Sequence, residues 1–494
     1  MAAVGWKLYG DGRTPPPGAV VRPEERLSWG RTAGLGAQHV VAMFGATFVF
    51  PVIMGLNPNL AIMMSGVATV MFLLVTKGKV PSYLGTSASF VAGVAAIRAQ
   101  HGSSSDVTGA ILVAGLVLAA VGLIVHVGGS RIVHAVLPPA VTGAVVMLIG
   151  FNLAPVVAGI YWPQDQYVAL LTMAFVILAA VLLPGFWGRI AIFLGLIFGY
   201  LLSWLFDHAF GTINSFIAAT GQVGEHHRIS WGGVKSADWI GFPPHTHASG
   251  GHEVVGWHWP TFGGTFILLV LPSVIALIAE NTGHVKAVAE MTGDDLNPYL
   301  GRALFGDGLG TTVASLFGGS PTTTYAENIG VMAATRVYST AAYYVAAIVA
   351  ILLGFIPKFG AIVSATPGGV LGGITVVLYG MIGLLGAKIW KENGVDFANP
   401  VNLVPLAAGI VAGIGGVTMQ FTKDFSIGGI ALGTLVTIIA YHLVAALAPP
   451  HLRRGLAAQR PAPGPIALED AAGLADAGLT DDVDAPAGPV RPIA

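Results

Sequence analysis

PTTTYAENI, residues 321–329, interrupts a long apolar region with a proline, three threonines and a carboxylate. A second stretch, PSYLGTSASF at 81–90, has the same order of a proline, hydroxyl side chains and a short apolar run. Proline and glycine before a hydroxyl cluster are typical of an extended segment that leads into a helix. Paired interrupted segments at matching places in two halves of a chain indicate the binding site of a membrane transporter.

The composition around these stretches is that of an integral membrane protein. Of the 494 residues, 54% are hydrophobic and 10% are charged, whereas soluble domains are about a quarter charged. Apolar runs of about 18 residues or more mark membrane helices, and they recur from 37–56 to 427–448. With softer segments such as 207–220 and 369–387 included, we expect about 14 spans. The chain has no cysteine, which excludes disulfides and cysteine nucleophiles.

The basic residues set the expected orientation. If both termini are cytoplasmic and the loops alternate, most of the 23 Lys and Arg residues fall on the inner side, as the positive-inside rule requires. A repeat of seven spans must be inverted, because its two copies start on opposite sides of the membrane. The expected fold is an all-α polytopic membrane protein with about 14 transmembrane segments in a 7+7 inverted repeat. It includes two short half-helix segments with extended, β-like lead-ins.

Three segments lie outside the expected bundle. Residues 1–32 are polar and show no apolar run with a cleavage site, so we expect a cytoplasmic segment and no cleavable signal peptide. Residues 221–262, an expected extracytoplasmic loop, hold six of the 14 histidines. These histidines either bind a metal ion or are ordinary polar loop residues, and the absence of a His-x3-His spacing gives no support to a metal site. Residues 449–494 are rich in Pro, Ala and Gly with an acidic end, which predicts a disordered cytoplasmic tail.

Few acidic residues fall within the expected spans. A charge at mid-bilayer costs about 3 kcal/mol, so such residues usually face a cavity and have a function. Glu280 is followed four residues later by His284, on the same helical face, and the two can share a proton. The alternative is a buried ion pair that only fixes helix packing.

Glu327 is expected in the first turn of the second half-helix, where unpaired backbone N–H groups and the helix dipole favour an acceptor-rich ligand. The carboxylate would accept the ligand's N–H donors, or it caps its own backbone. Asp307, between two glycines, fits a structural N–H acceptor better than a substrate ligand. Gln38 and His39 form another polar pair at membrane depth, for which a satisfied core histidine is the alternative. The aromatic residues that could stack on a planar ligand, or only pack, are Tyr325, Phe90 and Tyr379.

Three motifs resemble one transporter family. ENIGVMAATR at 327–336 fits the signature Gln/Glu/Pro-Asn-x-Gly, four residues, then Thr-Arg/Lys/Gly of the nucleobase–ascorbate (nucleobase–cation symporter 2) family. QHVVAMFGATFVFP at 38–51 resembles its first-span Gln-His motif, and AENTGHVKAVAEMTG at 279–293 resembles the eighth span of its bacterial uracil permeases. The resemblance covers about 33–448 and keeps the order of the motifs.

The resemblance implies a core domain (33–130 and 263–362) and a gate domain (131–220 and 363–448) in a proton symporter that is usually dimeric. It implies that Glu280 and Glu327 bind the base and that His284, with Glu280, couples protons. Where the family's uracil permeases carry an aromatic residue, this chain has Ala88, with Phe90 nearby. The other residues carried over are Tyr325 and Ala326 beside the second carboxylate, Tyr379 on the gate side, and a polar network of Gln38, His39, Asn328 and Asp307.

A glutamate at the first signature position resembles the uracil group of this family, whereas purine members tend to carry glutamine. Uracil offers two N–H donors and two carbonyl acceptors, which carboxylates and half-helix N–H groups can satisfy in a dry cavity. We therefore expect proton-coupled uracil uptake across the inner (cytoplasmic) membrane by an elevator mechanism.

No His-Glu-x-x-His, Gly-x-Ser-x-Gly or phosphate-binding loop is present, so no enzymatic activity is expected. No cofactor is expected beyond the proton as coupling ion. The expected partners are uracil or a related nucleobase, protons, the lipid bilayer and a second copy of the chain; a net charge of −1 gives no reason to expect nucleic acid. The alternatives are a purine symporter for xanthine or urate, a passive nucleobase channel, and a membrane sensor that reads metal through 221–262.

Overall fold

The computed structural model describes most of the chain between residues 5 and 457. Its gaps are 14, 16–18, 130–134, 136, 185, 219–220, 250–251 and 422–425, and side chains are not described at 44–46, 186, 189, 249, 252, 290, 326–327, 333–334, 426, 428, 454–455 and 457. The predicted disordered tail begins with a helix, α22 (Pro450–Ala457), whose first-turn proline is compatible with a helix start and whose Leu452 carbonyl oxygen accepts from the Asn399 amide over 2.9 Å. That prediction is therefore wrong for these residues, and 458–494 lie outside the described part.

Apolar helices make up most of the described chain. Eight of the described helices, some made of two pieces, are long and apolar enough to cross a membrane, and a ninth span is bent by 83° where α17 meets α18. The chain is therefore a multi-pass membrane protein. The helices of the first half are α1 (Trp29–Ala42), α2 (Phe44–Met54), α3 (Pro58–Val75), α4 (Val91–Ala99), α5 (Ser104–Gly128), α7 (Pro139–Phe151), α8 (Ala154–Val156), α9 (Gln166–Leu182), α10 (Phe186–Arg189) and α11 (Ala191–Phe210). Those of the second half are α13 (Gly264–Val270), α14 (Pro272–Thr292), α15 (Leu300–Leu316), α16 (Ala326–Thr335), α17 (Thr340–Gly354), α18 (Pro357–Ser364), α19 (Gly368–Glu392), α20 (Pro400–Ile414) and α21 (Gly429–Leu447).

Two short strands precede the two half-length helices, as the proline and hydroxyl patterns predict. Strand β3 (Leu84–Thr86) continues through a 3-10 turn (Ala88–Phe90) into α4, and strand β8 (Thr322–Thr324) leads into α16. The strands pair antiparallel, with Gly85 opposite Thr323. The two half-helices therefore begin at the same place, and their first-turn N–H groups lie beside it.

Close packing of α5 on α15 depends on glycines that face each other. A Cβ added at Gly308 would meet the backbone of Ala119 and Gly115, and one at Gly301 would meet the backbone of His126. Because these contacts are to main-chain atoms, no side-chain rearrangement could relieve them. The abundant glycine of the sequence thus serves close helix contact here, as expected for membrane bundles.

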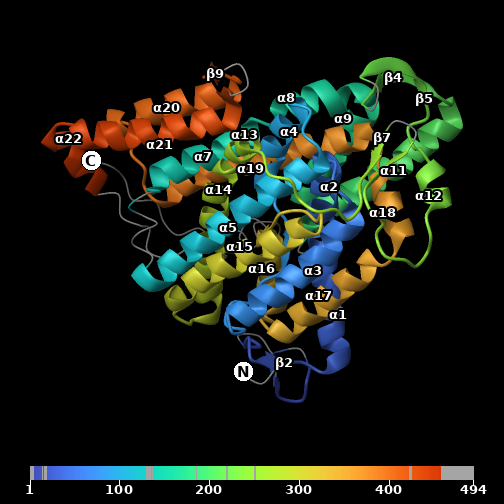
Figure 1. The fold of residues 1–494 in the computed structure, drawn as a ribbon. Coiled ribbons are helices and arrows are strands. Elements are labelled where there is room, and N and C mark those ends of the chain that lie inside the picture. The colour runs from blue at the N-terminus through green and yellow to red at the C-terminus, as the bar shows by residue number, and fades with distance from the viewer. Residues whose placement is uncertain are drawn as a thin grey trace, which may run out of the picture.

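The helices pack mainly within two sets (Figure 1). One set joins α5 with α15, α3 with α15 and α17, and α1 with α17. The other joins α19 with α7 and α9, α9 with α11, and α20 with α21 and α7. Helix α14 contacts members of both sets, α15 and α7. In Figure 1, α20 and α21 lie side by side and away from α1 and α17.

The N-terminal segment packs against the beginning of α17. Strand β1 (Lys7–Leu8) pairs in parallel with β2 (Glu25–Arg26). The Trp6 indole N–H donates to Thr340 Oγ1 over 2.9 Å, and the same hydroxyl donates to Pro23 O over 2.8 Å. The described N-terminal residues, from Trp6 onward, are therefore part of the fold.

The segment predicted as an extracytoplasmic loop, named the outer segment after that prediction, begins earlier than predicted. The apolar stretch 207–220 is not a span, because α11 ends at Phe210 and Gly211 adopts a φ of 70°. Beyond it, β4 (Ile213–Ile217) and β5 (Gln222–His226) form an antiparallel hairpin. A short helix, α12 (Gly232–Ser236), and a second hairpin of β6 (His247–Ser249) and β7 (His252–Val254) follow. Another hairpin, β9 (Thr418–Gln420) with β10 (Ser426–Gly428), connects α20 to α21.

A buried arginine attaches the start of the outer segment to the second set of helices. Arg228 Nε lies 2.6 Å from Asp165 Oδ2, and its Nη1 lies 3.2 Å from Asp207 Oδ1. Asp165 also caps α9, since it accepts the backbone N–H groups of Tyr167 and Val168. Asp207 belongs to α11, so one guanidinium joins two helices to the loop.

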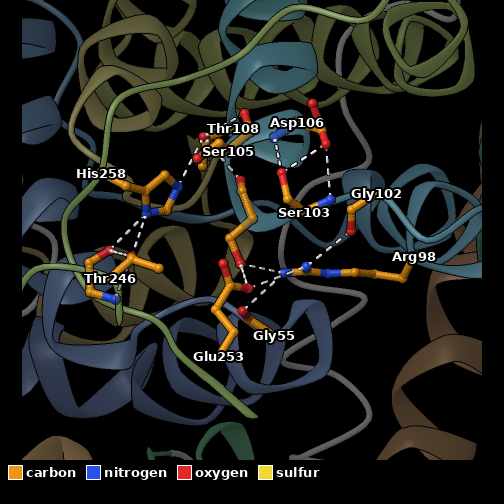
Figure 2. A network of polar contacts seen from close by, with 12 residues as sticks. Gly55, Arg98, Gly102, Ser103, Ser105, Asp106, Thr108, Thr246, Glu253 and His258 are labelled. Carbon is orange, nitrogen blue, oxygen red and sulfur yellow. Dashed lines mark hydrogen bonds and ion pairs between the residues drawn. The ribbon is translucent and has the colours of Figure 1, made fainter. Parts of the chain in front are cut away.

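The end of the outer segment is attached to the first set of helices, near the turn between α4 and α5 (Figure 2). Ser104 Oγ donates to Glu253 Oε2 over 2.7 Å, and Arg98 Nη1 lies 3.8 Å from the same oxygen. His258 is buried between Thr108 Oγ1, 3.1 Å from Nε2, and Thr246 Oγ1, 3.0 Å from Nδ1. The predicted polar loop therefore contacts both sets of helices, which its composition did not indicate.

Candidate functional site

Glu280 lies where the two half-helices begin. It is half-buried on α14, and it accepts a hydrogen bond from each half of the chain. Ser89 Oγ, in the turn before α4, donates to Glu280 Oε1 over 3.4 Å. Thr323 Oγ1, in β8, donates to Oε2 over 3.1 Å. A carboxylate at membrane depth is thus held by hydroxyls from both interrupted segments.

The second predicted carboxylate belongs to the same region by its backbone. Helix α16 begins at Ala326, after Tyr325 in extended conformation (φ −110°, ψ 133°), so Glu327 is in the first turn beside β8. The side chains of Ala326 and Glu327 lie outside the described residues, and their role stays a prediction.

The residues of the first half-helix are packed into the protein interior. Phe90 is fully buried in the apolar core, and Ala88 is partly buried against it. Ser87 Oγ accepts the backbone N–H of Ser89 over 3.3 Å, which fixes the turn between β3 and α4. The Phe90 ring packs against the apolar core here, and its stacking on a ligand stays a prediction.

His284 is buried one helical turn after Glu280. Its Nε2 lies 3.3 Å from the Pro81 carbonyl oxygen, at the start of the first interrupted segment. Its Nδ1 has no hydrogen-bond partner among the described residues. The predicted carboxylate–imidazole pair therefore shares a helix face, and the imidazole also contacts the lead-in to β3.

Asp307 is fully buried on α15, and the Asn281 amide donates to its Oδ2. Asn281 follows Glu280 directly, so this bond ties α14 to α15 beside the candidate site. Asn281 Oδ1 and Asp307 Oδ1 have no partner in the described part of the chain. The sequence predicted that Asp307 accepts a structural N–H hydrogen bond, but it did not identify Asn281 as the donor.

His39 and Asn328 meet across the fold. His39 Nδ1 lies 3.0 Å from Asn328 Oδ1, and the His39 ring lies 4.3 Å from the Tyr343 ring centre. Both His39 and Asn328 are buried, whereas Gln38 is half-buried. Because Asn328 follows Glu327, this contact fixes the first turn of α16 to α1.

Tyr325 and Tyr379 lie in different surroundings. The Tyr325 hydroxyl donates to the Thr86 carbonyl oxygen, so it crosslinks the two interrupted segments. Tyr379, on α19, is buried, and its hydroxyl has no partner among the described residues. It borders a mainly apolar cavity of about 460 Å³ whose lining does not include Glu280. The other lining residues are Gly150, Phe151, Ala154, Val157, Ala158, Trp162, Thr375, Val376 and Gly380.

Sequence reasoning missed the direct partners of Glu280. The hydroxyl clusters at 86–89 and 322–324 were visible, but which hydroxyl faces a carboxylate depends on the pairing of β3 with β8. No group of three or more His, Cys, Asp or Glu in the described ranges could hold a metal ion.

The chain is similar to known permeases over most of its length. Residues 30–422 match the Permease family. RutG, a candidate pyrimidine permease of Escherichia coli strain K12, is 42% identical over 446 residues, covering 89% of this chain and 95% of that protein. The uracil permease of Bacillus caldolyticus is 35% identical over 427 residues, covering 84% and 92%. The uracil permease of Escherichia coli strain K12 is 32% identical over 434 residues, covering 85% and 93%.

Two solved structures share the fold at low sequence identity. The transmembrane domain of the cyanobacterial bicarbonate transporter BicA gives a TM-score of 0.53 at 14% identity, covering 83% of this chain and 96% of that one. The murine anion transporter Slc26a9 in its inward-facing state gives 0.56 at 12% identity, covering 86% and 70%. At these identities the likeness concerns the fold alone.

Proposed function

The chain belongs to the nucleobase–ascorbate permease family, and from this premise we propose that it carries a pyrimidine nucleobase, uracil before others, across the cytoplasmic membrane. The chain is a transporter, not an enzyme, and its relatives in this family include uracil permeases. The observation that carries the proposal is the convergence of Ser89 and Thr323 on Glu280, at the start of both half-helices.

The chemistry of this place fits a flat ligand with N–H donors and carbonyl acceptors. The Glu280 carboxylate, held by the two hydroxyls, is an acceptor suited to the N–H donors of such a ligand. Glu327 would supply a second acceptor from the first turn of α16. The N–H groups that begin the two half-helices would donate to the ligand's carbonyls. Every polar edge of uracil could then be satisfied, which a water-poor site requires.

Proton coupling is proposed through His284 together with Glu280. The imidazole is buried one turn from the carboxylate, and one ring nitrogen has no partner among the described residues. A histidine in such a place can take and release a proton during transport. The proton would be the coupling ion, and no other cofactor is needed for this function.

We further propose an elevator mechanism in a 14-span, 7+7 inverted repeat. The helix set of α1, α3, α5, α15 and α17, with the half-helices α4 and α16, would form the core domain. The set of α7, α9, α11, α19, α20 and α21 would form the gate, which carries Tyr379. Both termini would be cytoplasmic, and two copies would associate through the gate.

Uptake of labelled uracil into proteoliposomes tests this function. We expect uptake to rise with an inward proton gradient and to fall when a protonophore dissipates it. Unlabelled uracil should compete, whereas xanthine and urate should not. Glu280→Gln and Glu327→Gln should each reduce uptake at least 10-fold, because the amide keeps one acceptor oxygen and replaces the other oxygen by an NH2 donor. Normal uptake by both variants, or competition by xanthine alone, would refute the proposal.

A further inference from the structure

Two hydroxyls that are almost fully buried converge on one carboxylate from different halves of the chain. Ser89 and Thr323 are each 2% exposed. They donate to different oxygens of Glu280, over 3.4 Å and 3.1 Å. A two-point attachment of this kind fixes the plane of a carboxylate, which a single bond would leave free to rotate.

Both donors are themselves held in place by the backbone around them. Thr323 is the middle residue of β8 and pairs with Gly85. The Ser89 carbonyl oxygen accepts from Ser273 Oγ over 2.7 Å, and the Ser89 N–H donates to Ser87 Oγ. Because Ser273 belongs to α14, as Glu280 does, the serine and the carboxylate are tied to the same helix. The donors therefore keep their positions without a ligand.

We propose that Thr323 and Ser89 are positioning residues for ligand recognition by Glu280. Each holds one carboxylate oxygen of Glu280, and together they fix the plane in which the carboxylate meets the N–H donors of the base. Neither needs to touch the base. The inference rests on the proposed function, and it adds that affinity depends on the pairing of the two interrupted segments, because β8 supplies one donor and the turn after β3 the other.

The chain contains a matched control for Thr323. Thr324 is the next residue of β8 and is also buried, but its Oγ1 has no hydrogen-bond partner among the described residues. A valine at either position has nearly the volume and shape of threonine and the same β-branched preference for a strand. Thr323→Val removes the hydroxyl that donates to Glu280 and also interacts with the neighbouring Asp307, whereas Thr324→Val removes a hydroxyl with no partner among the described residues.

The test is the kinetics of labelled uracil uptake in proteoliposomes, with transporter content measured for each variant. Thr323→Val should raise KM about 10-fold with kcat within about twofold, because a bond to a charged acceptor is lost in ground and transition states alike. Thr323→Ser should restore KM to within about threefold, and Thr324→Val should stay within about twofold. Ser89→Ala, whose bond is longer, should raise KM about threefold and provides an independent second variant.

Each outcome decides something. Equal KM values for Thr323→Val and Thr324→Val, with Ser89→Ala unchanged, would overturn the positioning role even if Glu280→Gln is inactive. If Thr323→Val does not accumulate in the membrane, the KM of Ser89→Ala decides. A raised KM supports the positioning role, and an unchanged KM overturns it. Normal uptake by both Glu280→Gln and Glu327→Gln would instead refute the proposed function itself.

Discussion

Arg228→Met should destabilise the protein strongly, because it leaves two buried carboxylates without their cation. The guanidinium lies 2.6 Å from Asp165 and 3.2 Å from Asp207, and the side chains of Arg228, Asp165 and Asp207 are 9%, 4% and 14% exposed. Removal of one partner from a buried ion pair costs about 3–5 kcal/mol. Both carboxylates keep backbone N–H partners, such as Tyr167 for Asp165, so we expect about 3 kcal/mol, the low end of that range.

Thermal unfolding of the purified protein in detergent, followed by intrinsic fluorescence, measures this effect. The midpoint of Arg228→Met should fall by about 5 °C or more, since 1 kcal/mol shifts the midpoint of a large domain by roughly 2–4 °C. Lys235→Met removes the same charge from an exposed position of the same segment and should leave the midpoint unchanged.

A compensating variant separates the lost charge balance from lost packing. Asp165→Asn and Asp207→Asn, combined with Arg228→Met, remove the uncompensated charges while amide oxygens still accept the backbone N–H groups. This triple variant should recover at least half of the lost stability. If Arg228→Met unfolds within about 1 °C of Lys235→Met, or if the triple variant is less stable than the single one, the reasoning is refuted.

Two further predictions concern the helix contacts and the interrupted segments. Gly308→Leu should prevent accumulation of folded protein in the membrane, because its side chain would meet the backbone of α5. Gly34→Ala is the control and should accumulate normally, because the space around its Cβ is open. Fluorescence-detected size-exclusion chromatography compares the amounts of folded protein for the two variants. Tyr325→Phe removes the hydrogen bond to Thr86 and should lower stability by about 1 kcal/mol, and an unchanged thermal midpoint would contradict this.

Local chemistry made the interrupted segments predictable. Proline disfavours a continuing helix, and hydroxyl side chains bond to free backbone N–H groups, so Pro81 and Pro321 mark breaks together with the hydroxyls that follow them. Proline alone does not mark a break, because Pro51 and Pro405 lie inside helices. The cost of a charge in an apolar environment indicated a function for Glu280, whereas its place at the same site as these breaks was implied only by the family resemblance. These features depend on residues close in sequence or on the membrane alone.

The hydrogen bonds between residues far apart in the sequence could not be predicted from local sequence patterns. The Ser89–Glu280 bond joins residues 191 positions apart, and the His39–Asn328 contact joins residues 289 apart. The stretch 207–220 was misread because hydropathy does not distinguish an apolar helix end from an apolar strand that begins after Gly211. The attachment of the outer segment through Glu253 was hidden because its partner Ser104 is 149 positions away in the sequence.

The three identical residues of β8 have a consequence for how reliably the two half-helices assemble. A slip of one residue along β3 would turn Thr323 away and bring Thr322 or Thr324 to its face, since neighbouring side chains alternate. With threonine at all three places, an alcohol would still be presented to α14 after such a shift. Three consecutive threonines thus tolerate an assembly error that a mixed sequence would turn into the loss of one of the hydroxyl donors to Glu280.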